Sequence, residues 1–138
     1  MVDKDVIVSR IKQIEEHFQR ISAYGGLSYE DFLKDGKTQD VIEYNLFQIV
    51  NHLIDIIQHI VVDEGYGFPQ TAYEAAKMLG DKGILDSNDF ELLKKMIGFR
   101  NIVGHEYIAL NKNVVYSIFT KGKGDIQMIL TKITERFL

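Results

Sequence analysis

The stretch TQDVIEYNLFQIVNHLIDIIQHIVVDEG, residues 38–65, decides the fold. It lacks proline, and its only glycine is the last residue, so it can form an uninterrupted α-helix of roughly seven turns. Apolar side chains cover most of the circumference of this helix: Val41, Ile42, Leu46, Phe47, Ile49, Val50, Leu53, Ile54, Ile56, Ile57, Ile60 and Val61. A helix that is apolar on most sides needs other helices to cover it, which predicts an all-α bundle around this segment.

One narrow strip of this helix is polar. It consists of Tyr44, Gln48, Asn51, Asp55 and His59, which fall within a sector of roughly 80°. The polar strip is either a solvated face or the lining of a cleft or a symmetric subunit contact, and its spacing alone favours neither. Asp55 stands four residues before His59, where its carboxylate can fix the tautomer of the imidazole and raise its basicity. Asn51, Asp55 and His59 are therefore possible cleft residues.

The segments before the long helix predict two further helices with short connections. A stripe of apolar residues spaced by fours and threes indicates a first helix that ends near residues 25–26. The stripe consists of Ile7, Ile11, Ile14, Phe18 and Ile21. Ser28 resembles a capping-box residue and opens a short helical turn that Gly36 closes. Thr38 then opens the long helix, which runs to about Asp63.

The second half of the chain carries similar start signals. Thr71 opens a helix as part of a capping box, and that helix ends near residues 80–83. Asp86 is placed to cap the next helix. A short helix at 114–119 and a last one over 125–138 complete the set. We therefore expect an antiparallel, up-and-down helical bundle.

Length and composition fit one globular domain, residues 1–138, with 46% apolar and 26% charged residues. The lack of cysteine excludes disulfides and thiolate metal sites, and it fits a reducing cytoplasm. The first residues lack the apolar core of a signal peptide. The sequence also has no run of about 18 uncharged apolar residues, so it predicts no membrane span. The net charge of −4 argues against coating nucleic acid by bulk electrostatics, so any contact with RNA must depend on a local cluster.

The segment GFRNIVGHEY, residues 98–107, gathers polar groups that an amphipathic helix does not need for folding. The core line of its helix is taken from four apolar residues: Leu92, Met96, Phe99 and Val103. Arg100 lies about 80° from that line, Asn101 about 180° and His105 about 220°. Gly104 leaves a notch between Arg100 and His105. A glycine inside a helix costs about 1 kcal/mol relative to alanine, so Gly104 either ends the helix or makes room for a ligand or a second chain.

These side chains suit chemistry on a phosphodiester. Arg100 offers planar, bidentate donors to phosphate oxygens, and His105 titrates near neutrality and can pass a proton in either direction. Asn101 stands one turn before His105 and can hydrogen-bond the ring or a substrate. We expect neither a metal nor a cofactor. Taken alone, the same residues also fit a surface ion pair at Arg100 and a polar helix end at His105.

RNIVGHEY, residues 100–107, resembles the R-N-x-x-x-H-x-Y signature of the HEPN superfamily, and more narrowly its HepT-like toxin branch. Two longer stretches resemble the middle and the C-terminal half of that family, namely NHLIDIIQHIVVDEGYGFPQTAYEAAKMLGDKGIL and ELLKKMIGFRNIVGHEYIALNKNVVYSI. Together they cover most of residues 41–120. The resemblance implies an up-and-down helical homodimer with a cleft between the subunits that uses the Arg and His motif of both chains.

The resemblance also implies an activity and a partner. The activity is that of a metal-independent endoribonuclease toxin, in which Arg100 holds the scissile phosphate, His105 is the acid–base group and Asn101 supports their geometry. Attack by the ribose 2′-hydroxyl gives a cyclic phosphate and a free 5′-hydroxyl end. Tyr107 resembles the acceptor for AMP groups that a small nucleotidyltransferase antitoxin delivers, as in type VII toxin–antitoxin systems.

A second interpretation belongs to a different class of function. The acidic balance and the polar strip also fit a non-catalytic subunit that presents a substrate or regulatory surface to a small nucleotidyltransferase. Such a protein leaves RNA intact and forms a stable complex with the transferase, so an assay of RNA cleavage separates the two interpretations.

Overall fold

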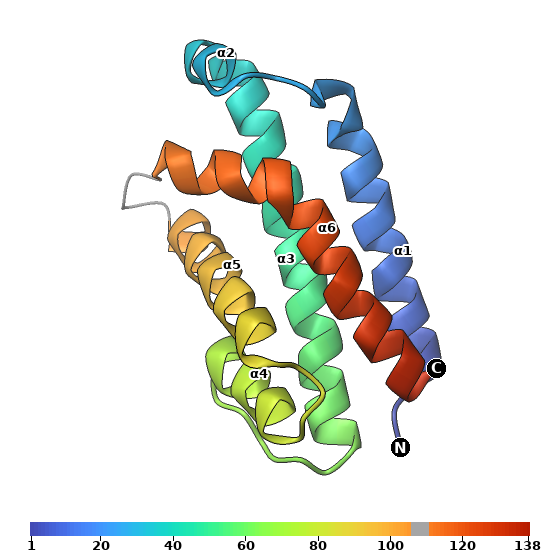
Figure 1. Ribbon diagram of the computed structural model, residues 1–138. Helices are drawn as coiled ribbons and strands as arrows, with labels where there is room; N and C mark the ends of the chain where they lie inside the picture. Colours follow the sequence, from blue (N-terminus) through green and yellow to red (C-terminus); the bar gives the residue numbers. More distant parts are fainter. Residues whose placement is uncertain (106–110) are drawn as a thin grey trace.

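The computed structural model describes residues 1–105 and 111–138, with only the backbone of His105. The described residues form six α-helices and one short 3-10 helix. They are α1 (Lys4–Ile21), η1 (Ser22–Tyr24), α2 (Tyr29–Lys34), α3 (Gly36–Asp63), α4 (Ala72–Asp81), α5 (Ser87–His105) and α6 (Lys112–Phe137). The four long helices α1, α3, α5 and α6 alternate in direction along the chain (Figure 1). The predicted all-α, antiparallel bundle is therefore confirmed.

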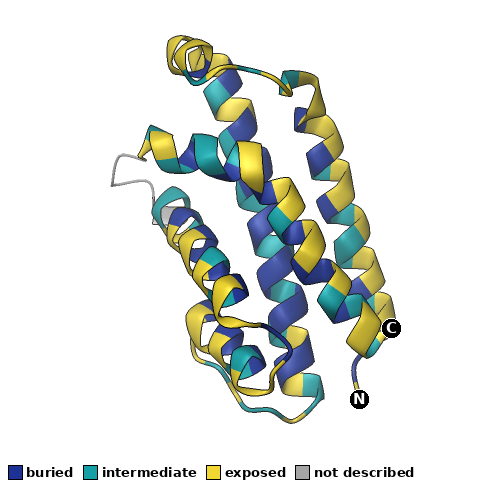
Figure 2. Ribbon diagram, viewed as in Figure 1, coloured by how far each residue is buried: buried dark blue, intermediate teal, exposed yellow. Residues whose placement is uncertain are grey.

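The long apolar helix lies at the centre, as predicted. α3 packs against α1, α4, α5 and α6, and its buried apolar residues form the middle of the core (Figure 2). By length and composition alone, α3 is also the one helix of the described residues that is long and apolar enough to cross a membrane. This is weak evidence for a span, because 56% of the apolar window is buried inside the bundle.

Local capping chemistry sets most of the helix starts. The side chains of Ser28, Thr71 and Asp86 accept hydrogen bonds from backbone N–H groups of the helices that follow them, as predicted. The prediction for Thr38 is wrong, because α3 begins two residues earlier and Asp35 caps it. The Thr38 N–H donates to Asp35 Oδ1 (3.1 Å), and the Thr38 hydroxyl donates to Asp35 Oδ2 (2.8 Å). These hydrogen bonds from Thr38 lower the pKa of Asp35.

The prediction of two separate C-terminal helices is also wrong. α6 is one helix from Lys112 to Phe137 and includes both Gly122 and Gly124, although Figure 1 shows that it bends along its course. Each glycine costs about 1 kcal/mol in a helix. Gly122 is buried, and a Cβ there would lie 3.1 Å from Ile118 Cγ2, so close packing accounts for this glycine. Burial of the apolar residues on both sides outweighs the cost of the two glycines and keeps the helix continuous.

Candidate active site

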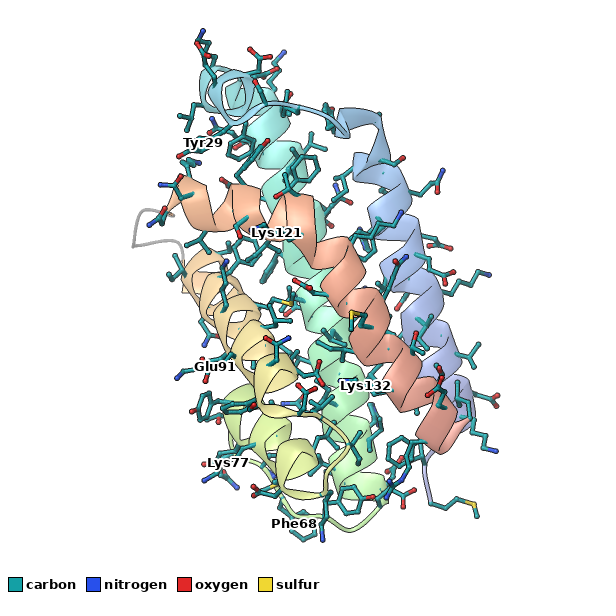
Figure 3. The ribbon with its side chains drawn as sticks, viewed as in Figure 1. Tyr29, Phe68, Lys77, Glu91, Lys121 and Lys132 are labelled. Atoms are coloured by element: carbon teal, nitrogen blue, oxygen red, sulfur yellow. The ribbon has the colours of Figure 1, made fainter. Side chains whose placement is uncertain are left out.

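The first turn of α5 is fixed against α6. Asp86 and Asp89 cap it reciprocally, since the Asp89 N–H donates to Asp86 Oδ1 (2.8 Å) and the Asp86 N–H donates to Asp89 Oδ2 (3.0 Å). Lys132 of α6 (Figure 3) donates to both carboxylates. One of them, that of Asp89, is buried. The hydrogen bonds from the Asp89 N–H and from Lys132 lower the pKa of Asp86. This network anchors one end of α5 and so sets the course of the helix toward the motif at its other end.

Arg100 lies on the buried side of α5, which corrects the predicted angle. The predicted core line left out Leu93 and Ile97, which are only 0% and 5% exposed. Leu93 precedes Arg100 by seven residues, so the two side chains project within about 20° of each other. Arg100 is half-buried, and its Nε is buried without a hydrogen-bond partner among the described residues. A buried N–H donor without a partner is costly, which makes this guanidinium a strong candidate for binding an anion.

The last turn of α5 packs on α3. α5 continues to His105, so Gly104 does not end the helix. Gly104 is exposed, and a Cβ there would lie 3.8 Å from Phe47 Cζ of α3. Asn101 is exposed, in keeping with its predicted position opposite the core. The side chain of His105 and the whole of Tyr107 lie outside the described residues.

The polar strip of α3 remains accessible in the structure. Tyr44 and His59 are exposed, and Gln48, Asn51 and Asp55 are half-buried. Asp55 does not pair with His59 as the sequence suggested, because its Oδ2 lies 3.5 Å from Arg10 Nε of α1. The strip is therefore flanked by α1 on the side of Asp55 and by α5 on the side where Gly104 meets α3.

The structure adds three polar residues that sequence reasoning missed. His17 of α1 and His52 of α3 stack with their ring centroids 5.7 Å apart. His17 Nδ1 lies 2.9 Å from Asn45 Oδ1, and Asn45 is buried. The sequence signal was a histidine beside the apolar stripe of α1, but this pairing depends on the register between α1 and α3. None of the described residues form a group of three or more His, Cys, Asp or Glu side chains that could hold a metal ion.

Comparisons with known proteins decide the family. A family model described as Ribonuclease HepT-like matches residues 14–133. The chain belongs to the HepT-like family. It is 30% identical over 130 residues to the mRNA nuclease HepT of Shewanella oneidensis, covering 94% of this chain and 96% of that protein. It is 27% identical over 115 residues to the tRNA nuclease HepT of Aphanizomenon flos-aquae, covering 83% of this chain and 78% of that protein.

A solved structure shares the fold of this HepT-like protein. The tri-AMPylated HEPN toxin of Shewanella oneidensis, in complex with MNT antitoxin, superimposes with a TM-score of 0.86 at 28% identity. The match covers 95% of this chain and 98% of that toxin. These comparisons confirm the family resemblance that residues 100–107 suggested.

Proposed function

We propose that this HepT-like protein is a metal-independent endoribonuclease toxin that acts as a homodimer. The observation that carries the proposal is the placement of Arg100 and Gly104 on the last turns of α5, where the Arg100 Nε is buried without a partner among the described residues and Gly104 is exposed. Membership of a family that includes named mRNA and tRNA nucleases supports this activity. In the proposed dimer, two copies of this end of α5 face one cleft.

Arg100 would bind the scissile phosphate. Its guanidinium is charged at any working pH, and its planar fork matches two phosphate oxygens. The burial of Nε holds the stem of the side chain against the bundle, so the remaining N–H groups are oriented before the substrate arrives. Donors that are positioned in advance stabilise the negative charge that develops on the phosphate in the transition state.

His105 would move the protons of the cleavage step. It accepts the proton of the ribose 2′-hydroxyl as the 2′-oxygen forms a bond to phosphorus. The bond between phosphorus and the 5′-oxygen of the next nucleotide breaks, and that oxygen takes the proton from His105 and leaves as a hydroxyl, which returns the imidazole to its starting state. The products are a cyclic phosphate and a free 5′-hydroxyl end. Asn101, one turn before His105, would support the geometry of the ring or the substrate.

The test is cleavage of RNA by the purified dimer in the presence of EDTA. We expect the wild-type protein to leave cyclic-phosphate ends, and His105→Ala to lower the rate roughly 10²- to 10⁴-fold, the usual contribution of an acid–base group. Arg100→Ala should also lose activity, whereas Arg136→Ala, which removes an exposed arginine of α6, should keep it. Equal cleavage by His105→Ala and wild type would remove the basis of the assignment. An inactive wild-type protein that still binds a nucleotidyltransferase would instead identify a non-catalytic partner subunit.

We further propose that a small nucleotidyltransferase antitoxin neutralises the protein by AMPylating Tyr107. In this step the Tyr107 hydroxyl oxygen bonds to the α-phosphorus of ATP, and pyrophosphate leaves. The attached AMP would bring a phosphate to Arg100 and fill the notch at Gly104. The AMPylated HEPN toxin in complex with MNT antitoxin supports this proposal. Intact-mass measurement after incubation with the transferase and ATP should detect added AMP on the wild type and none on Tyr107→Phe; equal AMP addition to Tyr107→Phe would place the acceptor elsewhere.

A further inference from the structure

Three rings form a row where α1 and α3 meet. Tyr44 of α3 is 56% exposed, and its ring packs edge-on to His17 with centroids 6.4 Å apart. His17 in turn stacks on His52 at 5.7 Å, with an angle of 29° between the ring planes. The ring row, as we call Tyr44, His17 and His52, is therefore continuous from the exposed Tyr44 of α3 through α1 and back to His52 of α3.

The central ring of the ring row, His17, is held in a defined state. The buried Asn45 donates its amide N–H to the Val41 carbonyl (2.8 Å), which leaves its Oδ1 to accept from His17 Nδ1. His17 therefore carries a proton on Nδ1, and its plane is fixed. Burial, followed by the charges of His17 and Arg10, lowers the pKa of His52, which keeps this ring uncharged at neutral pH.

The ring row begins next to the motif of α5. Phe47 meets the last turn of α5 at Gly104, and Tyr44 stands one helical turn before Phe47 on the same side of α3. Gln48 and Asn51 follow these two rings at a spacing of four and present amide groups beside them. A strand bound at the end of α5 thus has a direct path onto the ring row.

The carboxylate within the polar strip has a cation beside it. The carboxylate of the strip is that of Asp55, and Arg10 lies 3.5 Å from it. The pair offsets this negative charge next to the rings. A surface of rings and amides suits the bases of an RNA strand, because the bases can stack on the rings and hydrogen-bond to the amides.

We propose that the ring row Tyr44–His17–His52 is a platform on which bases of a single-stranded RNA stack while its phosphates reach Arg100. This inference rests on the proposed ribonuclease function and extends it to the residues that grip the substrate. Stacking on rings tolerates any base, so the ring row supplies affinity for single strands without selecting a sequence. It would favour unpaired RNA, because bases inside a duplex are already stacked on one another.

The test measures binding of a short, fluorescently labelled single-stranded RNA to the full-length dimer, with His105→Ala as the background so that the RNA stays intact. Tyr44→Ala should weaken binding roughly 5- to 150-fold, the effect of losing one stacked base. Tyr44→Phe keeps the ring and should restore most of the affinity. Phe68→Ala is the matched control, because Phe68 is an aromatic residue, 82% exposed, in the loop at the opposite end of the bundle (Figure 3). It should bind RNA as tightly as the background.

Two results of the binding test would overturn the proposal. The first is equal RNA affinity of Tyr44→Ala and the background. The second is dissociation of the dimer in Tyr44→Ala, measured by light scattering, which would make the ring row a subunit contact. Failure of the ribonuclease proposal is distinguishable, because the wild-type protein then cleaves no RNA. With His105 restored, Tyr44→Ala should raise KM for the RNA and leave kcat nearly unchanged, whereas a loss confined to kcat would also argue against a binding platform.

Discussion

Replacing Gly104 by alanine separates the fold of this protein from its function. The added Cβ would lie 3.8 Å from Phe47 Cζ and 4.0 Å from Phe47 Cε2, which is ordinary van der Waals contact. The isolated fold therefore has room for the methyl group. Alanine is favoured over glycine in a helix by about 1 kcal/mol. We expect Gly104→Ala to leave Tm unchanged or to raise it by roughly 2–4 °C.

RNA cleavage should respond in the opposite direction. In the proposed cleft, the methyl group takes space that the RNA or the second subunit uses. An extra group in a close-packed contact costs about 1–3 kcal/mol. This corresponds to a loss in kcat/KM of roughly 5- to 150-fold. Gly98→Ala is the matched control, because Gly98 lies on the same helix, is exposed, and a Cβ there would meet no atom within 4 Å among the described residues.

The assay combines thermal melting, light scattering and RNA cleavage for both variants. Gly98→Ala should gain a similar increase in Tm and cleave RNA at the wild-type rate. If Gly104→Ala forms an intact dimer and cleaves as fast as wild type, the lack of a side chain at Gly104 has no role in the cleft. A marked fall in its Tm would instead show that the contact with Phe47 is tighter than the distances imply.

Four further substitutions test the account of the fold. Gly124→Ala should raise Tm by roughly 2–4 °C because a Cβ there meets nothing within 4 Å among the described residues. Gly122→Ala should lower Tm because its Cβ would lie 3.1 Å from Ile118 Cγ2, and equal shifts of Tm in the two variants would contradict this difference. Burial lowers the pKa of His52 below 6.5, so the unfolded chain binds more protons and the free energy of unfolding falls as the pH drops through this value. Urea unfolding above and below pH 6.5 should show a smaller loss of unfolding free energy for His52→Gln than for wild type. An equal loss in the two proteins would contradict the lowered pKa of His52. Tyr116→Phe loses the hydrogen bond from the Tyr116 hydroxyl to the Leu27 carbonyl (2.6 Å). The free energy of urea unfolding should fall by about 0.5–1.5 kcal/mol, and RNA cleavage should not change. An unchanged free energy of unfolding would mean that water replaces the hydrogen bond.

The sequence was most informative where local chemistry sets the structure. The apolar circumference of α3 predicted its central place, because a helix with so much apolar surface has to be covered. Ser28, Thr71 and Asp86 marked helix starts through side-chain acceptors that act within three residues. The same chemistry misled at the start of α3. Asp35 and Thr38 are both favourable N-cap residues. The sequence does not show which of the two accepts the hydrogen bond from the other, and therefore which one caps α3.

The direction of Arg100 and the continuity of α6 depend on tertiary packing. Leu92 and Leu93 are adjacent and equally apolar, so the sequence does not say which one faces the core. The structure buries Leu93, and this turns Arg100 toward the bundle. Likewise, the structure joins the two predicted C-terminal helices into α6, whose buried residues on both sides of Gly122 pack on the bundle.

The candidate site was predictable in part. The family motif predicted Arg100, Asn101, His105 and Tyr107 as site residues, but only the structure shows the buried Nε of Arg100 without a partner among the described residues. The stack of His17 on His52 joins two helices whose relative register no local pattern encodes. Residues that are distant in sequence and paired across helices were therefore missed.

The central claim is that two copies of the end of α5 share one cleft. The chain contains no cysteine, so Gly98→Cys gives one site for a spin label in each subunit. The distance between the two labels in the dimer is then measured by double electron–electron resonance. Two helix ends that flank one RNA strand are separated by two to three helix diameters, which predicts a single distribution at about 20–35 Å. A distribution centred near about 50 Å, as expected for α5 ends on opposite outer faces, would contradict the claim.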